Sequence, residues 1–123
     1  MLSTEHQAGV ITLTLQRPER GNALGPELVE ALISAAEAAM ADQSVHTLVL
    51  RGAGRHFCTG LDLTDLATLS DGDLLLRLVR IETLLALLWH APIRTVALAH
   101  GRTWGAGATM VRHDRAAVRD PRL

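Results

Sequence analysis

Alternating and helically spaced apolar residues divide the chain into strand-like and helix-like segments. Apolar residues alternate with threonine in the VITLTL run, and similar short apolar runs recur twice. These patterns predict strands over 10–15, 45–50 and 95–99. Apolar residues spaced three and four apart predict helices over 26–40, 71–89 and from about 105 to 111. The tail from 112 to 123 is charged and carries no clear pattern.

The alternation of these predicted strands and helices favours an α/β fold. Pro26 suits a helix start, and the Ala91-Pro92 pair stops the long leucine-rich helix. We expect the buried face of that helix to use Leu75, Leu78, Val79, Leu85 and Leu88. Its surplus of leucine leaves a second reading open, in which part of the helix covers a partner subunit.

Composition narrows the class of protein. The chain is 48% hydrophobic and 20% charged with a formal net charge of -1, which excludes disorder and argues against nucleic-acid partners. All twelve basic residues are arginine, so mechanisms that need a lysine are excluded. The single cysteine, the absence of a leader pattern and the shortness of every apolar run predict a cytoplasmic chain with no membrane partner.

Three loop segments carry recognisable motifs. The first, residues 16–24, reads QRPERGNAL and follows the first predicted strand. The second, residues 52–63, reads GAGRHFCTGLDL and follows the next strand. The third, residues 92–107, reads PIRTVALAHGRTWGAG and runs from a strand into a glycine-bearing turn. Each motif is weak by itself, but their order and spacing together form a specific signal.

Together these segments resemble the crotonase (enoyl-CoA hydratase/isomerase) superfamily, with a match over roughly 10–110. The resemblance implies the N-terminal portion of the crotonase-like (ClpP/crotonase) ββα-spiral fold. We therefore expect one domain over 1–123 that is apparently truncated, with an atypical tail over 112–123. The resemblance also implies a homo-oligomer, either a trimer or a hexamer.

The resemblance implies an acyl-CoA thioester as substrate, with coenzyme A as part of that substrate and no covalently bound cofactor. Two backbone N–H groups, of Leu61 and Ala106, would stabilise a thioester enolate as an oxyanion hole. Residues implied to contact substrate or coenzyme are Arg17, Arg20, Phe57, Cys58, Thr59, Gly60, Asp62, Trp104, Gly105 and Gly107.

One position departs from the family pattern in a way that affects function. Hydratases of this family carry a glutamate where this chain has Thr109, and their second glutamate would fall beyond Leu123. A hydroxyl does not replace a carboxylate as a general base near neutral pH. The enzyme reading therefore stands beside a non-catalytic one, a CoA-binding or oligomer-associated paralogue. A small flavodoxin-like domain is a remote third reading.

Simpler interpretations exist for several of these residues. The 105–107 glycine turn alone is typical of a helix start, and it is no dinucleotide fingerprint. Cys58 beside His56 is interpreted as a buried small residue and Asp62 as a loop-fixing turn residue. Thr109 also fits a helix-facing filler, and Trp104 fits either an acyl pocket or ordinary packing. The six histidines show no metal-ligand spacing.

Overall fold

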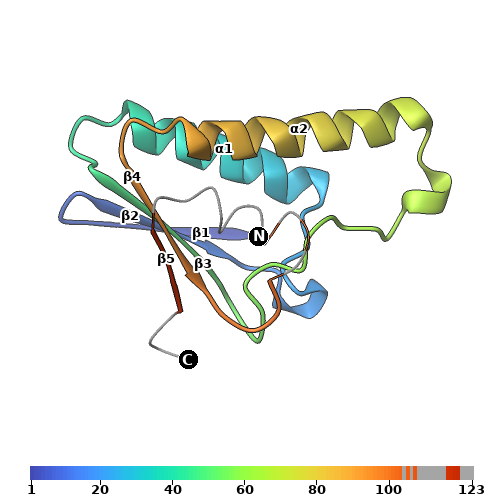
Figure 1. The fold of residues 1–123 in the computed structure, drawn as a ribbon, viewed down its shortest axis with the longest axis horizontal. Coiled ribbons are helices and arrows are strands. Elements are labelled where there is room, and N and C mark those ends of the chain that lie inside the picture. Colours follow the sequence, from blue (N-terminus) through green and yellow to red (C-terminus); the bar gives the residue numbers. More distant parts are fainter. Residues whose placement is uncertain (104, 106, 108–115, 120–123) are drawn as a thin grey trace.

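The computed structural model describes residues 1–103, 105, 107 and 116–119, and it contains a five-stranded sheet with two long helices on one face (Figure 1). The strands are β1 (Leu2–Gln7), β2 (Val10–Leu15), β3 (Thr47–Gly52), β4 (Arg94–Ala99) and β5 (Ala116–Arg119). Their order in the sheet follows the chain. β1 pairs antiparallel with β2, whereas β2, β3, β4 and β5 are mutually parallel.

The two helices are α1 (Pro26–Ala41) and α2 (Asp71–Trp89), and short 3-10 turns span Pro18–Arg20 and Leu66–Thr68. Pro26 occupies the first turn of α1, where a missing N–H costs nothing. The Ser70 side chain accepts a hydrogen bond from the Asp73 N–H (3.1 Å) and so caps α2. Both helices begin where the sequence predicted, and α2 also ends at its predicted residue.

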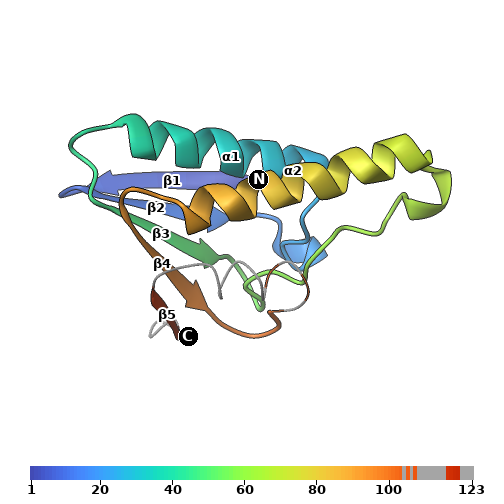
Figure 2. The ribbon, with the colours of Figure 1, turned by 45° about the horizontal axis from the view of Figure 1, so that its top comes forward.

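The core lies between the sheet and the helices (Figure 2). Alternate strand residues point toward the helices, and Leu13, Leu15, Leu48 and Leu50 are all buried. They join a cluster that includes α1 residues such as Leu28. Each buried leucine contributes about 1.5–3 kcal/mol of transfer free energy, so this layer stabilises the packing of the helices on the sheet.

Two strands were not predicted. β1 has mostly exposed, polar side chains, and its strand form comes from pairing with β2 across a tight turn. Ala8 and Gly9 both have positive φ (53° and 79°) in that turn, and an alanine gives little signal for such a backbone. β5 lies in the tail that carried no pattern; it is paired with β4.

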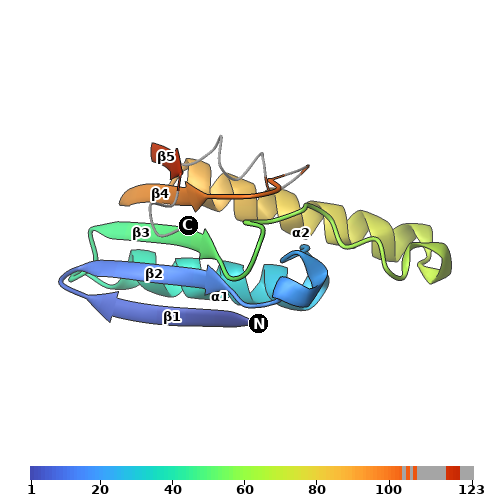
Figure 3. The same cartoon turned by 90° about the horizontal axis from the view of Figure 1, so that it is seen from below.

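The predicted buried face of α2 was partly wrong. Leu75, Leu78 and Val79 are exposed, whereas the buried residues are Ile81, Leu84, Leu85 and Leu88. The reason is position: the N-terminal half of α2 extends past the end of the sheet (Figure 1, Figure 3). Periodicity identifies an apolar face, but it does not tell how far the neighbouring layer reaches.

Candidate functional site

Three loops meet where β2, β3 and β4 end. Residues 16–25 follow β2, residues 53–65 follow β3, and the segment from 100 follows β4. Because these strands are parallel, their carboxyl ends lie at one edge of the sheet (Figure 3). Open α/β sheets bind ligands at that edge. The structure therefore brings the three sequence motifs together.

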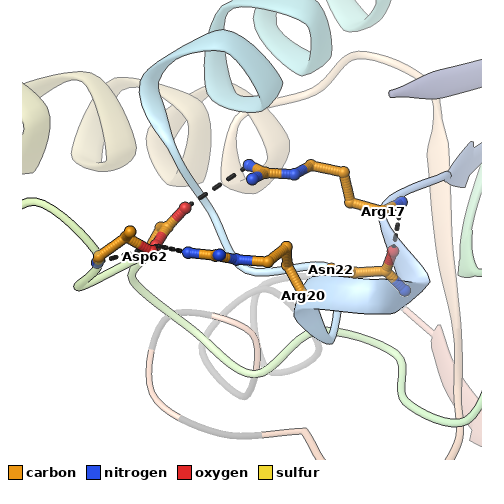
Figure 4. A network of polar contacts seen from close by, with 5 residues as sticks. Arg17, Arg20, Asn22 and Asp62 are labelled. Atoms are coloured by element: carbon orange, nitrogen blue, oxygen red, sulfur yellow. Dashed lines mark hydrogen bonds and ion pairs between the residues drawn. The ribbon is translucent and has the colours of Figure 1, made fainter.

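Asn22 joins the first loop to the second. Its side chain is fully buried, and Nδ2 donates to the carbonyl oxygens of Ala53 and His56, both at 2.9 Å. Its Oδ1 accepts from the Arg17 N–H at 2.8 Å (Figure 4). Asn22 also has a positive φ (56°), which asparagine tolerates better than most residues. Sequence reasoning did not select Asn22 as a site residue, although an asparagine after a loop glycine was the available signal.

The second loop is joined in turn to the third. Phe57 N–H donates to the His100 carbonyl oxygen (2.9 Å), and Arg102 N–H donates to His56 Nδ1 (3.0 Å). His100, which is buried, donates through Nε2 to the carbonyl oxygen of Gly54 (2.8 Å). These bonds fix the second loop between the other two, so the backbone of the site is held from both sides.

The Leu61 amide is a backbone donor that the pairing of the first two loops leaves unused. Leu24 N–H donates to the Gly60 oxygen (2.7 Å), and Asp62 N–H donates to the Leu24 oxygen (3.1 Å). Leu61 lies between Gly60 and Asp62 in the sequence, and it consequently directs its own N–H away from Leu24. Among the described residues, this N–H has no acceptor. Gly60 before it has φ of 97°, a conformation that favours glycine.

Gly105 and Gly107 lie directly against this loop. A Cβ added to Gly105 would sit 3.7 Å from the Gly60 Cα, and one added to Gly107 would collide with the Cys58 carbonyl oxygen. The backbones of Cys58 and Thr103 also pair as an isolated parallel β-bridge. The structure therefore places the two predicted glycine loops side by side. Trp104, Ala106, Thr109 and most of the helix predicted over 105–111 lie outside the described residues.

Phe57 and Cys58 are both fully buried, so neither side chain reaches the surface. Burial raises the pKa of the Cys58 thiol to about 11, against the smaller opposing effect of the Gly60 N–H. Such a thiol is not a nucleophile at neutral pH, and its interpretation as a buried small residue is confirmed. Thr59 is half-buried, and its N–H donates to the Gly21 oxygen (3.1 Å). This segment thus offers a ligand mainly backbone groups.

Arg17, Arg20 and Asp62 form a charged cluster beside the loops (Figure 4). Asp62 Oδ2 lies 3.5 Å from Arg17 Nη1, and its Oδ1 lies 3.6 Å from Arg20 Nη2. The Thr64 hydroxyl and N–H both donate to Asp62 Oδ1, which confirms Asp62 as a turn residue. Those hydrogen bonds, followed by Arg20 and Arg17, lower the pKa of Asp62. The cluster carries a net charge of +1, from two guanidinium groups and one carboxylate.

Arg20 is the more accessible of the two cations, with 40% of its side chain exposed against 22% for Arg17. Within the described part of the chain, no group of three or more His, Cys, Asp or Glu residues is placed to hold a metal ion. In the same part, no helix has both the length and the apolar character needed to cross a membrane.

A family model for enoyl-CoA hydratase/isomerase matches residues 5–113. Among curated proteins, the enoyl-CoA hydratase AFT6-1 of Alternaria alternata is 38% identical over 101 residues, covering 82% of this chain and 33% of that protein. The 1,2-epoxyphenylacetyl-CoA isomerase of Escherichia coli (strain K12) is 36% identical over 108 residues, with coverages of 85% and 41%.

Solved structures give the same result for the fold. An enoyl-CoA hydratase/isomerase from Xanthobacter autotrophicus Py2 superposes with a TM-score of 0.88 at 28% identity, covering 94% of this chain and 44% of that one. An enoyl-CoA hydratase/isomerase family protein from Silicibacter pomeroyi does so with a TM-score of 0.88 at 32% identity, with coverages of 95% and 49%. The chain thus spans about half the length of these structures, and less of the curated relatives.

Proposed function

The chain belongs to the enoyl-CoA hydratase/isomerase family, and on that premise we propose that it binds an acyl-CoA thioester where its three loops meet. The observation that carries the proposal is the Leu61 N–H, which has no acceptor among the described residues and lies in a backbone fixed by the neighbouring loops. The two curated relatives named above differ in reaction, yet both of their names refer to a coenzyme A thioester.

The chemistry follows from where charge develops on such a substrate. Removing a proton next to a thioester carbonyl, or adding a nucleophile in conjugation with it, places negative charge on the carbonyl oxygen. A fixed N–H aimed at that oxygen stabilises the charge without reorganisation. Leu61 supplies one donor in this proposal and Ala106 the other; neither role depends on the side chain. Gly105 lies close to Gly60, which supports an arrangement in which both N–H groups point to the same oxygen.

The charged cluster gives the coenzyme a partner in the same proposal. Coenzyme A carries phosphates, and guanidinium groups bind phosphate through charge-assisted hydrogen bonds. Arg20 is the better candidate because more of its side chain is exposed than that of Arg17, while Asp62 lies at a similar distance from both. Asp62 would then orient the Arg20 guanidinium and leave some of its N–H groups available to a phosphate.

Calorimetric titration of the 123-residue chain tests the proposal. We expect saturable binding of acetyl-CoA that is tighter than binding of free CoA, because only the thioester offers a carbonyl to the Leu61 N–H. Substituting Leu61→Pro removes this N–H and should weaken thioester binding about three- to tenfold, the value of one hydrogen bond. Leu61→Ala keeps the N–H and is the matched control.

Equal affinity of the folded wild-type chain for acetyl-CoA and free CoA would contradict the role of the thioester oxygen. Thermal melts of the two Leu61 variants identify any loss that comes from unfolding. If both variants stay folded and bind equally, the donor is not the Leu61 N–H.

A binding role without hydration is the second candidate, and the residue at position 109 favours it. Thr109 stands where hydratases of the family carry a glutamate, and threonine has no group that is basic at neutral pH. We therefore expect crotonyl-CoA absorbance to decay no faster with this chain than in buffer. Decay well above the buffer blank would reject the non-catalytic candidate.

A further inference from the structure

Two histidine side chains join the second loop to the third. His56 lies in the second loop, and its Nδ1 accepts the backbone N–H of Arg102 at 3.0 Å. His100 begins the third loop, and its Nε2 donates to the carbonyl oxygen of Gly54 at 2.8 Å. Each loop therefore contributes one imidazole and one backbone group. We call these two hydrogen bonds the histidine clasp.

The bonds of the histidine clasp determine where each ring carries its proton. The Arg102 N–H is a donor, so His56 Nδ1 must offer a lone pair and hold no proton. A carbonyl oxygen only accepts, so His100 carries a proton on Nε2. His100 Nδ1 is buried, and no described residue is its hydrogen-bond partner. Neutral rings with the proton on Nε2 satisfy both bonds.

A second proton on either ring works against the histidine clasp. On His56 it would occupy the lone pair that accepts the Arg102 N–H, and two donors would then face each other. On His100, whose side chain belongs to a residue only 9% exposed, it would place a buried charge where the described part of the chain offers no acceptor. The clasp therefore excludes protons that an open loop would accept.

The charged residues around the histidine clasp are mostly cations. The described segments that meet there carry Glu19, Arg51, Arg55 and Arg102. Glu19 belongs to the first loop, where Pro18 lies so close to Gly54 that an added Cβ would meet it at 2.6 Å. The acidic residues of the second loop, Asp62 and Asp65, instead line a hollow at the start of α1. Three guanidinium groups and one carboxylate leave a net charge of +2, which disfavours further positive charge.

The histidine clasp holds the two loops that carry the proposed donors. The second loop contains the Leu61 N–H, and the third leads into the turn at Gly105, which lies close to Gly60. The loops approach each other closely, since a Cβ added to Gly101 would collide with the Arg55 carbonyl oxygen. Opening the clasp would separate the two proposed donors.

We propose that His56 and His100 are positioning residues that hold the donor loops together only while both rings are neutral, so that thioester binding weakens in mild acid. This inference rests on the proposed thioester site and adds a pH response to it. A histidine in an open or unfolded chain takes up a proton as the pH falls through about 6.5. The stability that the clasp supplies is therefore present above that pH and is lost below it.

Two conservative substitutions keep the histidine clasp and remove its response to pH. His56→Asn retains an acceptor at the position of Nδ1, and His100→Gln retains a donor at the position of Nε2. Neither amide takes up a proton in this range, so the double variant is the test chain. His90→Gln, which replaces an exposed histidine at the end of α2, is the matched control.

Calorimetric titration with acetyl-CoA in mild base and mild acid tests the inference. At pH of about 7.5 the wild type and the double variant should bind equally, because histidines are then mostly neutral. At pH of about 5.5 the wild type should bind about three- to hundredfold more weakly than the double variant, with hundredfold as the limit for two histidines. The His90→Gln chain should follow the wild type. Comparing chains at one pH cancels the changing charge of the coenzyme phosphates.

Two further measurements need no ligand. In urea denaturation, the unfolding constant of the wild type should rise about three- to hundredfold more than that of the double variant between the same two pH values. Nitrogen NMR of the wild-type imidazoles needs no variant either, and it should place the proton of both rings on Nε2 at neutral pH.

The outcomes that overturn the inference can be told apart. Equal pH responses of the two chains in binding and in unfolding reject the clasp and leave the thioester site in place. A difference in unfolding without one in binding also overturns the inference, because the rings then stabilise the fold without positioning the donors. If acetyl-CoA binds no folded chain, the thioester site fails, and the unfolding constants alone decide the clasp. If the double variant does not fold, a proton on Nδ1 of either ring at neutral pH rejects the clasp.

Discussion

At the scale of single residues, the site depends on polar groups that join the loops from inside. Asn22 is buried and uses both its amide hydrogens and its carbonyl oxygen, so three backbone groups of two loops find partners. Asp62 joins the loops nearer the surface, where it accepts a hydrogen bond from Thr64 and forms ion pairs with two arginines. The Leu61 amide lies within the loops that these side chains hold, and the backbone bonds of Leu24 to Gly60 and Asp62 set its direction.

Replacing Asn22 should therefore destabilise the whole loop region. Asn22→Gly keeps a residue suited to positive φ while it removes the side-chain hydrogen bonds, and we expect a loss of about 2–3 kcal/mol of unfolding free energy. Asn22→Ala adds backbone strain and should cost about 1 kcal/mol more. Urea denaturation measures both. Losses below about 0.5 kcal/mol for both variants would show that water replaces the amide without penalty.

Asp62 makes the unfolding free energy of the chain depend on pH under acid conditions. Its pKa in the folded chain is lowered, chiefly by the Thr64 hydrogen bonds, below the unfolded value of about 3.9. Its contribution is therefore complete above pH of about 4 and is lost as the pH falls further, through the folded pKa. Melts from pH 7 to 2.5 should show a shallower acid decline for Asp62→Asn than for the wild type. Asp65→Asn, which removes an exposed carboxylate of the same loop, is the control; equal slopes in all three chains would contradict the assignment.

At the scale of elements, α2 does two different things along its length. Its C-terminal half packs against the core through Ile81, Leu84, Leu85 and Leu88. Its N-terminal half lies beyond the sheet and has exposed apolar side chains, among them Leu75, Leu76 and Leu78. One apolar pattern therefore covers a segment that is buried against the core and a segment that is exposed.

Substitutions along α2 should separate these segments by their effect on stability. Leu84→Ala removes a buried side chain and should lower the unfolding free energy by about 2–5 kcal/mol, because it leaves a cavity. Leu75→Ala, on the exposed part, should change it by less than about 0.5 kcal/mol. Chemical denaturation decides; a large loss for Leu75→Ala would indicate that this half is covered in solution.

The predictable part of the fold follows from the strength of local patterns. The strand of residues 10–15 and both long helices were predicted correctly because their residues face one core. β1 was missed because its partner, not its own side chains, makes it a strand. The site loops were located through their motifs, but Asn22 was not singled out, since its bonds span 31 and 34 residues of sequence. An asparagine after a loop glycine signals a turn, but the sequence does not show which distant backbone groups its side chain bonds.

At the scale of the whole molecule, the five strands lie in the sheet in chain order, and the three site loops come from neighbouring strands. The candidate site is therefore assembled within the half of the family fold that this chain spans, about 44–49% of the solved structures compared above. Large exposed apolar side chains gather on the N-terminal half of α2 and the loop before it, namely Leu63, Leu66, Leu75, Leu76, Leu78 and Val79. The homo-oligomer predicted from the sequence remains a prediction, and this surface is where to look for it.

The parallel pairing of β2, β3 and β4 also has a consequence for how the chain folds. Each parallel neighbour is reached only after an intervening helix, so the contacts that close the loops join residues 31 to 46 positions apart. Closing such long loops is entropically costly, and pairings of this kind form slowly. The second loop is bonded to both of its neighbours, so we expect the Leu61 amide to reach its place late in folding. A ligand that recognises that amide would consequently report the fraction of molecules that have completed folding, in refolding experiments where helix content has already recovered.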